Sequence, residues 1–80
     1  MKVVVLTSKH CSACEMMKRT LRDSVEYIDI EAHPEAIGES VGSLPVIRIM
    51  DGDKIVEELY GPVPKRVLEQ KVSDYVNHRH

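Results

Sequence analysis

Apolar and β-branched residues gather in four short runs along the chain, and these runs predict four strands. The run from Lys2 to Thr7 lacks alternation, which is typical of a strand covered on both faces in the middle of a sheet. The segment from Val25 to Ile30 is rich in strand-forming residues. The runs from Pro45 to Met50 and from Lys54 to Tyr60 are joined by Asp51-Gly52-Asp53, and this Asp-Gly dipeptide predicts an antiparallel hairpin.

Helical spacing of apolar residues predicts a first helix from about Ser12 to Asp23. Residues three and four positions apart lie on one face of a helix, and Cys14, Met17 and Leu21 have that spacing. A strand, a helix and a strand in this order form a right-handed βαβ unit. We therefore expect the first two strands to be parallel neighbours.

Two further helices are predicted in the second half of the chain. Pro34 suits the first turn of a helix, and a weak apolar stripe follows it in a short helix expected to end near Gly42. After the break at Gly61-Pro62-Val63-Pro64, apolar residues recur at helical spacing at Val67, Leu68, Val72, Tyr75 and Val76. The polar residues His78-Arg79-His80 end the chain. The predicted order is βαβαββα, an α/β class.

Length and charge narrow the class of protein. The chain has 80 residues, fewer than the roughly 100 to 150 of a common domain, so we expect one domain over residues 1–80. Eleven Lys and Arg are interspersed with 13 Asp and Glu, so there is no polybasic patch for nucleic acid or an anionic membrane. The longest apolar run, from Val3 to Leu6, is far shorter than the roughly 20 residues that span a bilayer. We expect a cytoplasmic protein.

The two cysteines form the sequence Cys11-Ser12-Ala13-Cys14, where the first strand gives way to the first helix. Three residues of helix bring the two side chains onto one face, where a disulfide can close. The helix N-terminus stabilises a thiolate at Cys11, and further positive charge is offered by Lys9, His10 and Lys18. Cys11 is therefore the candidate nucleophile. Cys14, expected to be less exposed, is the candidate resolving cysteine.

Metal binding is the main alternative, because two such thiols are also half of a zinc site. Zinc would need two more ligands, and the chain has no second C-x-x-C and no H-x-x-x-H. The histidines available are His10, His33, His78 and His80. The strand-to-helix context favours redox chemistry, so we assign no metal ligands. A redox-inert or metal-binding interaction module stays open as an alternative function.

Three segments together resemble the thioredoxin and glutaredoxin superfamily. They are the C-x-x-C motif with Lys18 four residues after it, the strand Glu26–Ile30, and Ser43-Leu44-Pro45-Val46. The chain is most similar to the small glutaredoxin-like redoxins that supply electrons to ribonucleotide reductase. This resemblance implies a minimal thioredoxin fold, with a four-stranded mixed sheet flanked by three helices. It also implies a cis Leu44-Pro45 peptide bond beside the disulfide.

The resemblance further implies a monomeric dithiol-disulfide oxidoreductase that acts on protein disulfides, with ribonucleotide reductase as a candidate target. No cofactor would be bound. Electrons from NADPH would arrive through a thioredoxin reductase-like flavoprotein or through glutathione. An extended substrate peptide would dock by main-chain hydrogen bonds at a site formed by His10, Ser12, Ala13, Leu44 and Pro45.

Glutathione dependence is a second alternative within the same superfamily. Its glutathione-binding members usually have a Cys-Pro-Tyr-Cys motif, a Thr-Val-Pro segment and a Gly-Gly-x-Asp turn. This chain has Ser12-Ala13, Ser43-Leu44-Pro45 and Tyr60-Gly61-Pro62-Val63 at the comparable places. A glutathione-dependent glutaredoxin is therefore kept as an alternative to a protein reduced by a flavoprotein.

Overall fold

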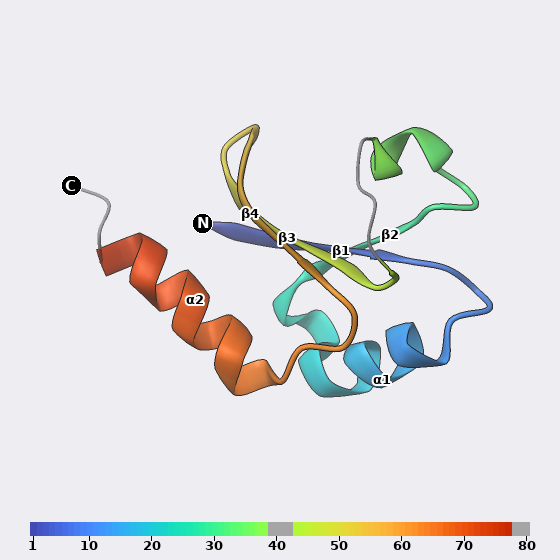
Figure 1. The fold of residues 1–80 in the computed structure, drawn as a ribbon, viewed down its shortest axis with the longest axis horizontal. Helices are drawn as coiled ribbons and strands as arrows, with labels where there is room; N and C mark the ends of the chain where they lie inside the picture. The colour runs from blue at the N-terminus through green and yellow to red at the C-terminus, as the bar shows by residue number, and fades with distance from the viewer. Residues whose placement is uncertain (39–42, 78–80) are drawn as a thin grey trace.

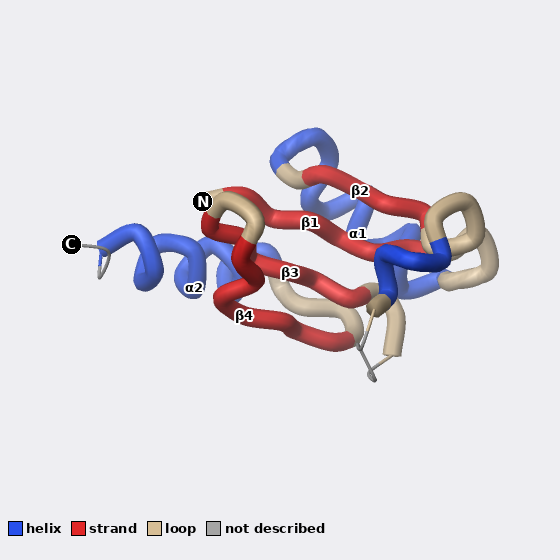
Figure 2. Tube along the Cα trace, turned by 90° about the horizontal axis from the view of Figure 1, so that it is seen from above, coloured by secondary structure: helices blue, strands red, loops and turns tan. Residues whose placement is uncertain are grey.

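A mixed sheet of four strands forms the centre of the computed structural model, which describes residues 1–38 and 43–77. The strands are β1 (Lys2–Thr7), β2 (Glu26–Asp29), β3 (Val46–Asp51) and β4 (Lys54–Tyr60). They lie in the order β2-β1-β3-β4, as Figure 2 shows. β1 is parallel to β2 and antiparallel to β3, and β3 and β4 are antiparallel. The predicted strands, the central place of β1, the parallel pair and the hairpin are all confirmed.

Both faces of β1 are covered, which explains why its sequence lacks alternation. Val4, Val5, Leu6 and Thr7 are all buried. Successive side chains of a strand point to opposite faces, so the core is split into two layers. Val5 belongs to one layer together with Ile47 and Ile49 of β3, and Val4 and Leu6 belong to the other together with Val46.

Two α-helices, α1 (Ser12–Leu21) and α2 (Lys65–Asn77), cover one face of the sheet (Figure 1). Met17 and Leu21 of α1 and Leu68 of α2 complete the layer that contains Val5. The predicted apolar stripe of α1 is confirmed, because Cys14, Met17 and Leu21 are its buried residues. After Leu21 the chain continues in a short 3-10 turn, η1 (Arg22–Ser24). None of the helices described is long and apolar enough to cross a membrane.

The third predicted helix is wrong for the residues described. Instead of an α-helix from Pro34, the chain forms a 3-10 turn, η2 (Pro34–Ile37), on the face of the sheet opposite α1 and α2 (Figures 1 and 2). The described residues therefore contain two α-helices rather than three. The predicted helix end near Gly42 lies outside the described residues.

The guanidinium of Arg48 explains why η2 does not continue as an α-helix. It donates hydrogen bonds to the carbonyl oxygens of Ala36 at 2.6 Å and Ile37 at 3.0 Å. Arg48 comes from β3 and also pairs with the carboxylate of Glu58 on β4 at 2.8 Å. Carbonyls that would accept helical N–H groups are thus bonded to a neighbouring strand. Gly38 then turns the chain away, with φ +54°.

Candidate active site

Cys11 and Cys14 are joined by a disulfide at the N-terminus of α1, and their Cα atoms are 5.2 Å apart. Cys11 is the N-cap of the helix, with extended backbone angles of φ −119° and ψ 105°. Its sulfur accepts a hydrogen bond from the main-chain N–H of Cys14 at 3.1 Å. The sulfur thus occupies the position that a Ser or Asp oxygen takes at an ordinary N-cap. A negative charge on this sulfur would face the N–H groups at the positive end of the helix.

The two cysteines differ in exposure, as the sequence predicted. Cys14 is fully buried, on the side of α1 that faces the sheet, whereas Cys11 is half-buried. The reason is local, because Cys11 precedes the first helical residue while Cys14 lies one turn inside the helix. A reagent approaching from solvent therefore reaches the sulfur of Cys11 before that of Cys14.

The Leu44-Pro45 peptide bond is cis, as the resemblance implied. Pro45 is buried, and its carbonyl oxygen accepts the N–H of Gly61 at 2.9 Å. β3 begins at Val46, which lies opposite Leu6 of β1. This register places Leu44 and Pro45 at the end of the sheet where β1 leads toward the cysteines.

The other predicted site residues surround the disulfide to different degrees. His10 and Ser12 are exposed and Ala13 is half-buried beside the cysteines along the chain. The main-chain N–H of His10 donates to Ser8 at 3.4 Å. Leu44 packs against the apolar layer on the η2 face of the sheet. The sheet register thus brings Leu44 and Pro45 to the correct end of the sheet, with the side chain of Leu44 partly used in the core.

Positive charge near the cysteines is arranged differently from the sequence expectation at Lys18. Its ammonium lies 3.9 Å from the carboxylate of Glu15 and 6.0 Å from the ring centre of Tyr27. These contacts direct Lys18 along α1 and toward β2. Lys9 and His10 are exposed in the turn before Cys11, so they are the cationic side chains adjacent to the nucleophile candidate in sequence.

Glu31 is a residue of this region that the sequence pattern does not single out. One of its carboxylate oxygens accepts hydrogen bonds from the hydroxyl of Ser8 at 2.8 Å and from the N–H of Lys9 at 3.1 Å. These bonds, chiefly the one from Ser8, lower the pKa of Glu31 from its ordinary value. The signal that could have found it is the parallel pairing of β1 and β2, because the carboxyl ends of parallel strands meet at one edge.

Among the residues described, no three His, Cys, Asp or Glu side chains are grouped so that they could hold a metal ion. Two of the histidines that the sequence offers as zinc ligands, His78 and His80, lie outside the described residues.

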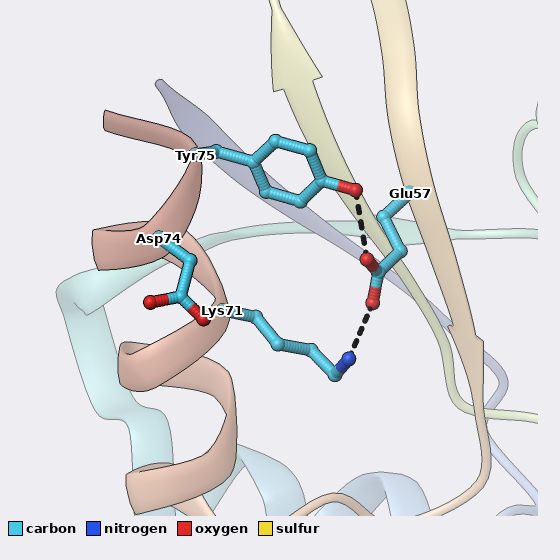
Figure 3. A pocket seen from close by; sticks show the side chains of 4 residues that line it. All are labelled: Glu57, Lys71, Asp74 and Tyr75. Atoms are coloured by element: carbon cyan, nitrogen blue, oxygen red, sulfur yellow. Dashed lines mark hydrogen bonds and ion pairs between the residues drawn. The ribbon is translucent and has the colours of Figure 1, made fainter. Parts of the chain in front are cut away.

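A pocket of about 260 Å³ lies between β4 and α2 (Figure 3). It is lined by Glu57, Lys71, Asp74 and Tyr75. The carboxylate of Glu57 accepts the hydroxyl of Tyr75 at 2.8 Å and pairs with the ammonium of Lys71 at 2.9 Å. These bonds lower the pKa of Glu57, and the bonds to Glu57 raise the pKa of Lys71 and of Tyr75. The polar groups of this pocket connect α2 to the sheet.

Comparison with known proteins gives a match in structure. No protein-family model matches the sequence, and no curated protein matches it. Thioredoxin 1 from the thermophilic eubacterium Thermosipho africanus TCF52B is similar with a TM-score of 0.75 at 18% identity, over 96% of each chain. A malarial protein is similar with a TM-score of 0.68 at 19% identity, over 95% of this chain and 99% of that chain. The protein therefore has a thioredoxin-like fold, with a cysteine pair at C-x-x-C spacing.

Proposed function

We propose that this protein is a dithiol-disulfide oxidoreductase that reduces disulfide bonds in other proteins. One observation carries the proposal. A half-buried Cys11 and a buried Cys14 form a disulfide at the N-terminus of α1, within a thioredoxin-like fold. A dithiol in this position can give two electrons and return to the disulfide without moving the helix.

The first step begins with the reduced protein, in which Cys11 is the thiolate. The N–H of Cys14 and the positive end of α1 stabilise its charge. This thiolate attacks one sulfur of the target disulfide, so the target S–S bond breaks and a mixed disulfide with Cys11 forms. The other target sulfur leaves as a thiolate and takes a proton from solvent.

The second step uses Cys14, which lies next to the sulfur of Cys11 and is screened from solvent. Cys14 loses its proton and attacks the sulfur of Cys11, which breaks the mixed disulfide and releases the second target thiol. The target has then gained two electrons and two protons, and Cys11 and Cys14 are oxidised to their disulfide. Burial favours this division of labour, because Cys14 is reached by Cys11 more easily than by an outside disulfide.

Docking and re-reduction complete the proposed cycle. An extended segment of the target would bind near Leu44 and Pro45, at the end of the sheet where β1 leads to the cysteines. His10, Ser12 and Ala13 would border it. Electrons would come from NADPH through a thioredoxin reductase-like flavoprotein or through glutathione, and ribonucleotide reductase is a candidate target.

The test is NADPH consumption during reduction of a model protein disulfide, with thioredoxin reductase and, in parallel, with glutathione and its reductase. We expect turnover with the flavoprotein. Cys11→Ser should lower it by roughly a hundredfold or more, because the attacking thiolate is lost. Cys14→Ser should accumulate mixed disulfides with the target, visible by mass spectrometry. Ser73→Ala, an exposed change on α2, is the control.

Other results would favour the alternatives. A Cys11→Ser variant with full turnover would rule out the proposed chemistry. Turnover with glutathione only, retained in Cys14→Ser toward glutathionylated substrates, would indicate a glutaredoxin that needs Cys11 alone. No turnover with either reductant, together with stoichiometric zinc in protein purified without chelator, would favour the metal-binding module.

A further inference from the structure

The turn that leads into Cys11 is held by a carboxylate from another part of the chain. The hydroxyl of Ser8 and the main-chain N–H of Lys9 donate to the same oxygen of Glu31, at 2.8 and 3.1 Å. The oxygen of Ser8 in turn accepts the N–H of His10 at 3.4 Å. Each residue between the end of β1 and Cys11 is therefore connected, directly or through Ser8, to Glu31.

Glu31 itself is anchored to the sheet. Its main-chain N–H donates to the side chain of Asp29 at 2.9 Å. The N–H groups of Ala32 and His33 donate to the carbonyl of Asp29 at 3.2 and 2.9 Å, which closes a turn directly after β2. The N–H of Ile30 donates to the carbonyl of Thr7 at 2.9 Å, so this turn is tied to the end of β1. A carboxylate mounted on a rigid turn can hold a less regular one.

The position of Cys11 depends on the turn before it. Its sulfur receives the N–H of Cys14 at 3.1 Å only while the backbone of Cys11 keeps its extended N-cap angles. A hydrogen bond to the charged form of an acid favours that form. If residues 8–10 are released, Cys11 gains freedom and its sulfur spends less time on the N–H of Cys14. The thiolate then loses part of its stabilisation.

We propose that Glu31 is a positioning residue for Cys11, which it acts on by fixing Ser8 and Lys9 and thereby keeping the Cys11 sulfur against the N–H of Cys14. The inference rests on the proposed function, because it assigns Glu31 a part in preparing the attacking thiolate. Glu31 touches neither the target nor the sulfur. Its role is mechanical and is carried by two hydrogen bonds.

The charge of Glu31 acts in the opposite direction from its hydrogen bonds. A negative charge near Cys11 disfavours the thiolate, so loss of the charge alone should favour it. The other charged groups around the turn are Lys9, His10, Glu15, Lys18 and Asp29. They are the same in all Glu31 variants. Two substitutions therefore separate charge from clamp: Glu31→Gln removes the charge but keeps an acceptor oxygen, and Glu31→Ala removes both.

The experiment is alkylation of the fully reduced protein by iodoacetamide across pH, with the modified Cys11 followed by mass spectrometry. Glu31→Gln should react at pH 7 as fast as the wild type or faster. Glu31→Ala should react about threefold slower than Glu31→Gln, as expected for a thiol whose pKa is about half a unit higher. Ser8→Ala, which removes one of the two donors, should fall between them.

Glu15→Ala is the matched control, because it removes a carboxylate from the first turn of α1 that pairs with Lys18 rather than with the turn. It should not slow alkylation. Far-UV circular dichroism verifies that each variant is folded. Equal rates for Glu31→Ala and Glu31→Gln, or a faster Glu31→Ala, would overturn the proposal. These rates need no target or reductase, so failure of the proposed function would appear separately, as absent NADPH turnover in the wild type.

Discussion

Two residues adopt the same rare backbone conformation, but only one of them is glycine. Arg22 has φ +50° and ψ −127°, and Gly38 has φ +54° and ψ −124°. A side chain is crowded in this region, which is occupied almost entirely by glycine. Arg22 is kept there because its N–H donates to the carbonyl of Lys18 and its carbonyl accepts the hydroxyl of Tyr27 at 2.7 Å. The helix that bears the cysteines thus ends on a strained residue.

Relief of this strain should stabilise the protein. We expect Arg22→Gly to raise the free energy of unfolding by roughly 1 kcal/mol, even though glycine gains entropy in the unfolded chain. Gly38→Ala should lower it by a similar amount or more, since an added Cβ would meet space but not an allowed backbone angle. Urea denaturation followed by far-UV circular dichroism measures both. Arg19→Gly, inside α1, is the control and should cost roughly 1 kcal/mol.

At the scale of elements, α2 is joined to the sheet by one apolar and one polar contact region. Leu68 is the buried residue of this helix, and Figure 1 shows the helix continuing past the sheet. Farther along, Tyr75 and Lys71 reach the carboxylate of Glu57 on β4 (Figure 3). Tyr75 also donates to the carbonyl of Val56 at 3.1 Å. The second half of α2 therefore depends on a charged contact.

This contact should make stability depend on acid pH. Lys71 and Tyr75 lower the pKa of Glu57, so its stabilisation is present above the ordinary value of 4.5 and is lost as pH falls through the lowered value. At pH 7, Glu57→Gln should reduce the free energy of unfolding by roughly 1 kcal/mol, a modest value for a partly exposed pair. Urea denaturation between pH 7 and about pH 3 should show this difference narrowing.

A difference between Glu57→Gln and wild type that stays constant over this pH range would contradict the assignment. Glu69→Gln is the matched control, because Glu69 is an exposed carboxylate of the same helix. It should stay within about 0.5 kcal/mol of the wild type at pH 7.

Short elements show where sequence patterns lose their meaning. The stripe of α1 repeats over three turns, so its buried face was predictable from Cys14, Met17 and Leu21. The segment after Pro34 offers too few apolar positions for a period to be established. Its conformation is decided instead by Arg48, whose guanidinium reaches across from β3 to the carbonyls of Ala36 and Ile37. Nothing local in the sequence identifies that donor.

The whole molecule is built on a sheet with an apolar layer on each face. One layer contains Ile49 with the buried residues of α1 and α2, and the other contains Leu6 with residues near η2. The two layers share the same central strands, β1 and β3. A chain of this size is expected to have only roughly 4 to 12 kcal/mol of stability, so neither layer is expected to persist alone.

We therefore expect a single cooperative unfolding transition for residues 1–80 as one domain. Ile49→Ala and Leu6→Ala should each lower the free energy of unfolding by roughly 2 to 5 kcal/mol, because both side chains are fully buried. Ile55→Ala, at a residue that is 45% exposed, should cost much less. Urea curves from circular dichroism and from amide hydrogen exchange should coincide. Two separate transitions, each affected by only one core variant, would contradict a single domain.

The sequence by itself determined the features that depend on residues close together in the chain. Strand runs, the stripe of α1 and the place of Cys11 at a helix N-terminus follow from periodicity and covalent spacing, which survive in any environment that buries one face. The different exposure of Cys11 and Cys14 follows from the same local geometry. The pairing of an accessible thiol with a buried one is therefore a property of this short segment of the chain.

Only the tertiary structure decided which distant side chains meet. Glu31 reaches Ser8 across a separation of 23 residues because β1 and β2 are parallel and end together. Arg48 holds η2, and Glu57 holds α2, through similar contacts between elements. Such partners depend on strand register and on the direction in which each side chain leaves the backbone, and both are set by packing of the whole sheet rather than by local sequence.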